Sequence, residues 1–444
     1  MRDLSRVGAE SRDEFERSAV AIAEPEVCGY TRRIVHMMGA SLRSTLVRSG
    51  CELALVSGVP AFATALMTGR PNVLQPDRTA SLIVSAMRRN WLTNDGPLVQ
   101  ELEARFAAFQ GVKHCVAVAN ATLGLQLAAR ALGMTGEILM PSFTFIGTAH
   151  ALAWIGLRPV FCDVSRETHT LDPQCVEDAI TSATGGILGV HIWGQPCDVE
   201  GLQRVAHRRD VPLLFDAAHA TGSSYGSVRL GGFGDAEVFS LHATKSINGL
   251  EGGMVATNDR GLAERVRLLR NFGFVGEDTV SGIGINAKMN EFSAAMALAN
   301  LECYDRLHAH DRDIHGAYRQ GLAGLDGIAL QECRPDCARC DHYAVLSVSE
   351  TAAIGSEALR RVLAAENVVA RRYFFPGCHR SPPYDRSAHR NLPITDKLCR
   401  TVMQLPTGLQ LTRDDAAKIA AIVAHACEHA DEVKAILAAR DTER

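Results

Sequence analysis

The sequence lacks the features that mark membrane and secreted proteins. It has no uninterrupted apolar run of about 18 residues, which a membrane-spanning helix needs. The nearest candidate, residues 51–68, is broken by Glu52, Gly58 and Pro60. The N-terminal region does not resemble a secretory signal, because it carries the acidic residues Asp3, Glu10, Asp13, Glu14 and Glu16. We therefore expect a cytoplasmic protein that has no membrane partner.

An excess of positive charge is also absent. The chain has 46 basic and 50 acidic residues and a formal net charge of -4. It therefore lacks the excess of basic residues that is typical of proteins that bind nucleic acid. Hydrophobic residues make up 47% of the sequence, which excludes disorder as its main state. A length of 444 residues suits two domains, one large and one smaller.

Paired cysteine motifs are scarce as well. The 13 cysteines are an odd number spread along the chain, which is not typical of a disulfide framework. One cluster, Cys333, Cys337 and Cys340 followed by His342, could form a metal knuckle. Its spacing differs from the common zinc patterns, and no second cysteine pair is evident. We favour a surface loop there and expect no bound metal.

Lysine is rare, which matters for any chemistry that needs an amine. Only six of the basic residues are lysines, at positions 113, 245, 288, 397, 418 and 434. A reaction that uses a lysine nucleophile therefore has few places to occur.

From about residue 70 the pattern becomes that of an α/β protein. Asp95-Gly96-Pro97 opens a helix that Gly111 ends. Short apolar strands then alternate with helices, which predicts a mainly parallel sheet covered by helices on both faces. The expected strands cover residues 114–119, 137–140, 159–162, 187–190, 212–215, 236–239 and 253–256. Ligands bind such sheets at the C-terminal ends of the strands.

The flanking regions differ from this core. Residues 1–67 show no clear periodicity and are predicted to form an N-terminal extension. Residues 68–308 form the expected large domain, which ends in a helical connection from about residue 290. Residues 309–444 form the expected smaller α/β domain, whose last helix begins with a capping box of Thr412 and Asp415.

Three polar positions follow the predicted strands. Asn120-Ala121-Thr122 lies between a strand and a helix, where backbone N–H groups can bind a phosphate. Taken alone the motif is a weak signal, and a plain helix cap is its usual explanation. Asp216 ends another strand and leads to His219. A carboxylate there could hold a protonated heterocycle nitrogen, and helix capping is the alternative.

The third position is Lys245, five residues after the strand-terminal Ser240 and close to Gly249, Gly252 and Gly253. A lysine in a glycine-rich turn beside buried strands is partly desolvated, which lowers its pKa and frees a nucleophile for Schiff-base chemistry. A solvated surface lysine is the alternative.

Together a phosphate cradle, an acid for a ring nitrogen and a reactive lysine are the components of a pyridoxal 5'-phosphate (PLP) enzyme. From about residue 70 to 427 the sequence resembles the DegT/DnrJ/EryC1/StrS family of sugar aminotransferases, with the fold type I architecture. The resemblance is carried by Asn120-Ala121-Thr122, Pro141-Ser-Phe-Thr-Phe145, Asp216-Ala-Ala-His219, Ser240-Leu-His-Ala-Thr-Lys245, Glu251-Gly-Gly253 and Gly284-Ile-Asn286-Ala-Lys288-Met289-Asn-Glu291.

The resemblance implies a role for each matching residue. Lys245 would be the Schiff-base lysine and proton carrier, Asp216 would pair with the pyridine nitrogen, and His219 would lie near the phenolic oxygen. The remaining roles are phosphate binding by Ala121, Thr122 and Ser240, ring stacking by Phe145, and contact of Asn286 with the cofactor phosphate of a second subunit, which implies a homodimer. Ala121 stands where many members have Gly, and Lys288 where Arg is frequent, so Lys288 has no assigned role.

The resemblance also suggests a substrate. Members that aminate C3 tend to carry a Tyr-Pro pair before the lysine, whereas this chain has His242-Ala243-Thr244 and looks more like C4 aminotransferases. We expect amino transfer from glutamate to a nucleotide-linked keto sugar such as dTDP-4-keto-6-deoxyglucose. The alternatives are a keto-cyclitol aminotransferase, a non-catalytic PLP-binding regulator and a nucleotide-binding dehydrogenase, although no strand–GxGxxG–helix unit supports the last.

Overall fold

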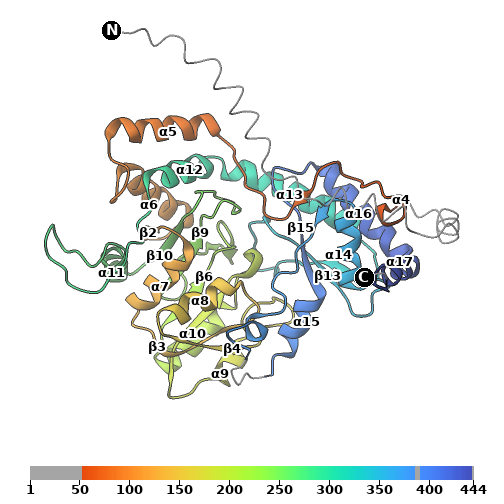
Figure 1. Ribbon diagram of the computed structural model, residues 1–444. Helices are drawn as coiled ribbons and strands as arrows, with labels where there is room; N and C mark the ends of the chain where they lie inside the picture. The colour runs from red at the N-terminus through yellow and green to blue at the C-terminus, as the bar shows by residue number, and fades with distance from the viewer. Residues whose placement is uncertain (1–52, 386–390, 443–444) are drawn as a thin grey trace, which may run out of the picture.

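The structure is a computed structural model that describes residues 53–385 and 391–442 (Figure 1). Its centre is a seven-stranded sheet with the strand order β2-β10-β9-β6-β5-β3-β4. Only β10 runs antiparallel to its two neighbours; the other pairs are parallel. The strands are β2 (His114–Val118), β3 (Thr135–Pro141), β4 (Arg158–Cys162), β5 (Thr184–Val190), β6 (Leu213–Asp216), β9 (Ala236–Ser240) and β10 (Gly253–Thr257). All seven predicted strands are present, and the mainly parallel α/β sheet is confirmed.

Helices cover both faces of this sheet, because alternate strand residues point to opposite sides. Val116, Met140 and Val238 pack under α7 (Ala121–Ala131), α8 (Ile146–Trp154) and α11 (Arg260–Arg270). The helices on the other face are α5 (Pro76–Arg89), α6 (Pro97–Gln110), α9 (Pro173–Glu177), α10 (Val199–Arg209) and α12 (Glu291–Leu301). There Ala117 belongs to the cluster that packs against α5, α6 and α12, and Phe215 to the cluster that packs against α9 and α10.

The C-terminal part forms a second core around a three-stranded antiparallel sheet. The sheet contains β11 (Ile328–Leu330), β13 (Ala344–Val348) and β15 (Val402–Leu405), in that order. The helices are α13 (Tyr304–Gly321), α14 (Ser356–Ala365), α16 (Arg413–Glu428) and α17 (Ala430–Thr442). The remaining C-terminal helix, α15 (Pro393–Thr401), packs Leu398 and Cys399 against the core of the central sheet instead. The predicted capping box of Thr412 and Asp415 is present at the start of α16. The predicted boundary at residue 308 falls within α13.

The described part of the predicted N-terminal extension packs on this second core. It contains α4 (Ala54–Ser57) and β1 (Leu66–Met67), and β1 pairs in parallel with β14 (Val368–Val369). The carboxylate of Glu366 accepts hydrogen bonds from the backbone N–H groups of Ala54 and Ala61, at 2.6 and 2.8 Å. Residues 1–52 lie outside the described residues, so the division of the chain into an extension and two domains stays a prediction.

A small sheet joins the two cores. In it β12 (Cys337–Ala338) pairs with β7 (Ser224–Tyr225), which in turn pairs with β8 (Val228–Arg229). Cys340 is buried beside this sheet, and its thiol contacts the carbonyl oxygen of His219 at 3.2 Å. The cysteine cluster and His342 are all described, and they do not gather their donor atoms into a metal-ligand group. Within the described ranges, no helix combines the length and apolar character needed to cross a membrane.

Candidate active site

A cavity of about 450 Å³ opens at the C-terminal edge of the central sheet, where the sequence predicts ligand binding. It is lined by the ends of β5, β6 and β9 and by the start of α7. The predicted residues that line it are Ala121, Thr122, Phe145, Asp216, His219, Ser240 and Lys245. Asn286, the remaining predicted residue, is exposed on the loop before α12 and is not part of the lining.

Asp216 is the last residue of β6, and its carboxylate is held from two sides. The Thr148 hydroxyl on α8 donates to Oδ2 at 2.8 Å, and the backbone N–H of Ala218 donates to Oδ1 at 3.0 Å. Burial raises the pKa of Asp216, and these two donors oppose that shift. A buried carboxylate of this kind stabilises a neighbouring cation, so it can keep a heterocycle nitrogen protonated. The predicted helix-cap alternative accounts only for the Ala218 contact.

Lys245 lies in the turn after β9 and points at the side chain of Tyr343, the residue just before β13. The distance from Nζ to the Tyr343 oxygen is 3.2 Å. Burial lowers the pKa of Lys245 to about 8, and the attraction of Asp216 offsets only part of that effect. Since neutral amine is the nucleophilic form, this lysine is more reactive near neutral pH than a solvated lysine. The surface-lysine alternative therefore does not describe this residue.

His219 is held as a neutral ring with a defined tautomer. Its Nδ1 accepts a hydrogen bond from the backbone N–H of Trp193 at 3.3 Å, so the ring proton is on Nε2. Burial, followed by the charge of Lys245, lowers its pKa well below the ordinary histidine value. The ring packs at 4.5 Å from Tyr343 and is stacked on Phe374. The Nε2–H group is thus a fixed donor beside the cavity.

The start of α7 forms the predicted anion cradle. Asn120 caps the helix, because its side chain accepts from the N–H of Leu123 at 2.9 Å, while Ala121 and Thr122 border the cavity. The helix approaches β10 very closely: a Cβ on Gly253 would lie 2.7 Å from the Ala121 nitrogen. Glycine is therefore required there, and the positive end of the helix dipole faces the cavity.

The comparisons with known proteins agree with this geometry. The family model of the DegT/DnrJ/EryC1/StrS aminotransferase family matches residues 76–424. The chain belongs to this family. It is a PLP-dependent aminotransferase with the fold type I architecture, as the resemblance implied. Membership decides against the dehydrogenase alternative.

Individual relatives cover most of the chain. The dTDP-4-amino-4,6-dideoxy-D-glucose transaminase of Escherichia coli is 33% identical over 75% of this chain and 91% of its own length. The dTDP-3-amino-3,4,6-trideoxy-alpha-D-glucose transaminase of Streptomyces venezuelae is 32% identical over 76% of this chain and 89% of its own. The crystal structure of DesI, analysed in the presence of its TDP-sugar product, has a TM-score of 0.84 and 42% identity, and covers 86% of this chain and 98% of its own.

The cavity residues of this aminotransferase fit PLP. Asp216 can hold the protonated pyridine nitrogen, Lys245 can hold the aldehyde carbon covalently, and the start of α7 can bind the phosphate. Phe145, which is 56% exposed before α8, supplies an aromatic face at the same cavity. Gly253 supports this arrangement, because a Cβ there would collide with the backbone of Asn120 and Ala121 and displace the start of α7.

Sequence reasoning missed several residues that position the reacting groups. Thr148 fixes Asp216 and Tyr343 contacts Lys245, although neither stands out in a strand-end search. His342, considered above only as a metal ligand, instead bonds Asp311 and the carbonyl of Thr244, both at 2.9 Å. Burial lowers the pKa of His342, but Asp311 outweighs this and raises it overall. The ring thereby fixes the residue next to the reactive lysine.

Proposed function

We propose that this aminotransferase moves an amino group from glutamate to C4 of a nucleotide-linked 4-keto-6-deoxy sugar. The observation that carries the proposal is Lys245, which is half-buried, hydrogen-bonded to Tyr343, and shares a cavity of about 450 Å³ with Asp216. The high likeness to DesI supports a nucleotide-sugar substrate, because that protein was analysed with its TDP-sugar product. The cavity lies open beside the cofactor residues, which leaves room for a substrate.

When PLP is bound, it supplies an electron sink that stabilises negative charge next to the amine-bearing carbon. The chain's own residues set up this chemistry. Asp216 keeps the ring nitrogen protonated, and the Nε2–H group of His219 can donate to the phenolic oxygen. Lys245, once free, is the base that can move a proton between carbon centres, since its pKa of about 8 is close to neutral pH. Tyr343 orients that amine.

The preference for C4 depends on the residues before Lys245. Overall identity does not decide it, because the C4 and C3 relatives named above are 33% and 32% identical. His242 and Thr244 line the cavity, and the His242 Nδ1 lies 2.9 Å from the Thr244 hydroxyl. These polar groups flank the approach to the lysine, so they favour the keto isomer whose hydroxyl groups they can bond.

A substrate panel tests the proposal. The purified enzyme with PLP and glutamate should convert a dTDP-linked 4-keto-6-deoxyhexose and leave the 3-keto isomer largely unchanged. NMR of the product locates the new amine. Amine at C3 would contradict the position of attack, and turnover of a keto-cyclitol alone would contradict the nucleotide-sugar substrate. Absence of transamination with every acceptor in the panel would contradict both the proposed acceptor and the glutamate donor.

We also propose that the active unit is a homodimer in which Asn286 contacts the cofactor phosphate of the partner subunit. Asn286 is exposed and outside its own chain's cavity, which suits a role in another subunit. Its loop also exposes large hydrophobic side chains, which is typical of an interface. These are Phe272, Phe274, Val275, Val280, Ile283 and Ile285, with exposed fractions of 39–84%.

Subunit exchange distinguishes a shared site from two independent ones. Lys245→Ala and Asn286→Asp are each expected to inactivate the homodimer. In a mixed dimer one site carries both lesions and the other carries neither, so complete exchange should restore about a quarter of wild-type activity. Two Lys245→Ala preparations exchanged in the same way are the control. No recovery after confirmed exchange, or a monomer by light scattering, would contradict the proposal.

A further inference from the structure

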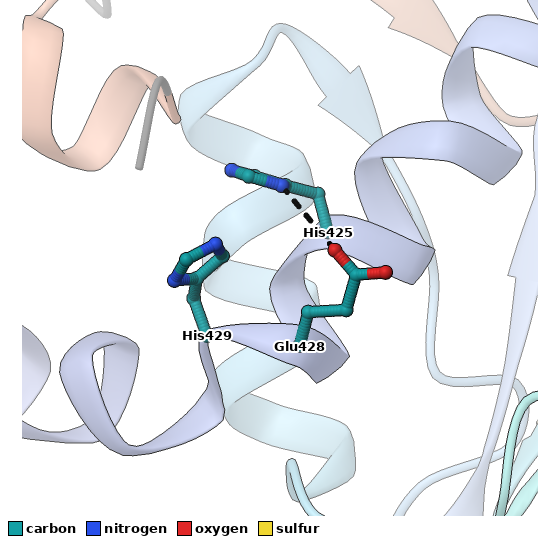
Figure 2. Close-up of side chains that lie close together, drawn as sticks. All are labelled: His425, Glu428 and His429. Atoms are coloured by element: carbon teal, nitrogen blue, oxygen red, sulfur yellow. Dashed lines mark ion pairs between the residues drawn. The ribbon is translucent and has the colours of Figure 1, made fainter. Parts of the chain in front are cut away.

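The junction between α16 and α17 gathers a group of metal-ligating side chains far along the chain from the catalytic residues. His425 and Glu428 lie in the last turn of α16, His429 ends that helix, and Ala430 begins α17. The spacing of three and four residues places the three side chains on one face, as Figure 2 shows. Among the described residues, the donor atoms of this group lie within 4.8 Å of one another.

The distances are close to those of a metal centre. Zinc bonds of about 2.0–2.2 Å in a tetrahedral site place neighbouring ligand atoms about 3.3–3.6 Å apart. His425 Nδ1 and Glu428 Oε2 are already 3.8 Å apart, with the carboxylate beside the ring in Figure 2. The Glu428 side chain is 70% exposed, so a small rotation can close the remaining distance without disturbing the core.

A second carboxylate lies where it can orient one of the rings. Glu432, on the first turn of α17, has its Oε1 at 3.8 Å from His429 Nδ1. This leaves Nε2 of His429 for a cation. Histidines that bind metals commonly present their other nitrogen to a carboxylate, which fixes the tautomer and increases the basicity of the ring.

The donor set selects the kind of ion. Two imidazole nitrogens and one carboxylate oxygen suit zinc, which accepts nitrogen and oxygen ligands and leaves a fourth position for water. Calcium and magnesium require mostly oxygen ligands and do not match it. The acidic residues Glu428 and Glu432 also make the local potential favourable for a divalent cation.

We propose that His425, Glu428 and His429 form a zinc site that fixes α17 to the end of α16, with Glu432 orienting His429. The ion holds the last turn of α16 and its C-cap residue His429, and Glu432 links this site to α17. The junction otherwise depends on backbone continuity and on the apolar face of α17. That face, formed by Val433, Ile436 and Leu437, packs into the second core. The site is structural, since none of its residues lines the catalytic cavity.

Calorimetric titration of the PLP-loaded, untagged full chain with zinc chloride tests the proposal, after chelator treatment and removal of free cofactor. The expected result is one zinc per chain. His429→Ala should abolish this binding, Glu428→Gln should weaken it by more than tenfold, and Glu432→Gln by about tenfold. Because Glu428 is exposed, the Gln variant keeps the fold and the cofactor absorbance. Zinc should raise the Tm of the wild type and not that of Glu428→Gln.

Two controls address binding elsewhere. His207→Ala removes another exposed histidine, in the last turn of α10, and should leave zinc affinity unchanged. The double variant Cys333→Ser and Cys337→Ser tests the cysteine cluster and should also bind zinc normally. The proposal is overturned if the wild type does not bind zinc, if binding persists unchanged in Glu428→Gln and His429→Ala, or if only the cysteine variant loses it.

Discussion

The catalytic cavity and the α16–α17 junction both concentrate ionisable side chains, yet they are built in opposite ways. Thr148, Asp216, Lys245 and Tyr343 come from positions far apart in the sequence and meet because strand ends converge at one edge of the sheet. The junction residues lie within one helical turn and need no tertiary contact to meet. One site depends on the whole fold, and the other on local structure.

The contrast shows what each kind of chemistry requires. A lysine that acts as a nucleophile at neutral pH needs an amine whose pKa is lowered. In Lys245 burial lowers the pKa to about 8. Cation binding needs lone pairs at suitable spacing, so partly exposed side chains suffice. Substitutions in the cavity should therefore change reactivity strongly, whereas those at the junction should change affinity for an ion and leave the chemistry intact.

The largest effect is expected for Lys245→Ala, which should lower kcat by about 10⁴-fold or more, because both the covalent attachment and the proton carrier are lost. Borohydride reduction of the wild type followed by peptide mapping should find the pyridoxyl group on Lys245. Lys113→Ala removes an exposed lysine and is the matched control, with unchanged activity. Labelling of Lys113 or Lys288 would contradict the assignment.

Asp216→Asn should have a smaller effect, lowering kcat by about 10²–10³-fold and weakening cofactor binding, because an amide stabilises the protonated ring nitrogen poorly. Thr148→Val removes one of the two donors to the carboxylate and should cost about tenfold. Steady-state kinetics and the cofactor absorbance measure both. Near-wild-type turnover of Asp216→Asn would show that the aspartate only caps the chain after β6.

The mildest perturbation is a change of pH, which should alter the rate at which the cofactor-free enzyme captures PLP. Capture requires neutral amine, so its rate should fall about tenfold for each pH unit below about 8 and reach a plateau above it. Stopped-flow absorbance over pH 6–10 gives the midpoint. Nα-acetyl-lysine is the control, and its rate should still be rising at pH 10, because the ordinary lysine pKa is 10.5. An enzyme rate that also continued to rise to pH 10 would show that burial does not lower the pKa of Lys245.

Much of the large domain could be predicted because its strands are continuous apolar runs bounded by turn residues. Such runs are distinctive when both sheet faces are covered, and all seven strands were located to within a few residues. The strand-end rule then selected Asp216 and Lys245 from the sequence alone. Because the chain has only six lysines, Lys245 had fewer competitors than its local pattern alone would have left.

The rest depends on contacts between distant residues. Nothing in the sequence around Thr148 or Tyr343 indicates that one lies against Asp216 and the other against Lys245. The docking of residues 53–67 was also missed, because β1 is two residues long and is fixed by pairing with β14 some 300 positions away. Short segments with long-range partners leave no periodic signal.

The docking of α4 and β1 on the second core has a mechanical consequence. The chain begins its described course on the smaller unit, crosses to the sheet domain after β1 and returns through α13 (Figure 1). Residues 374–385 and 391–399 then pack back onto the core of the sheet domain before the described chain ends on the smaller unit. Thr68 and Gly69, at the first crossing, line the same cavity as Asp216. The two units are linked at several places, including the pairing of β12 with β7, which restricts the motion of one against the other. Substrate entry should therefore involve only a small motion between the two units, and cutting the chain near Gly69 would release one of these restraints while leaving Asp216 and Lys245 in place.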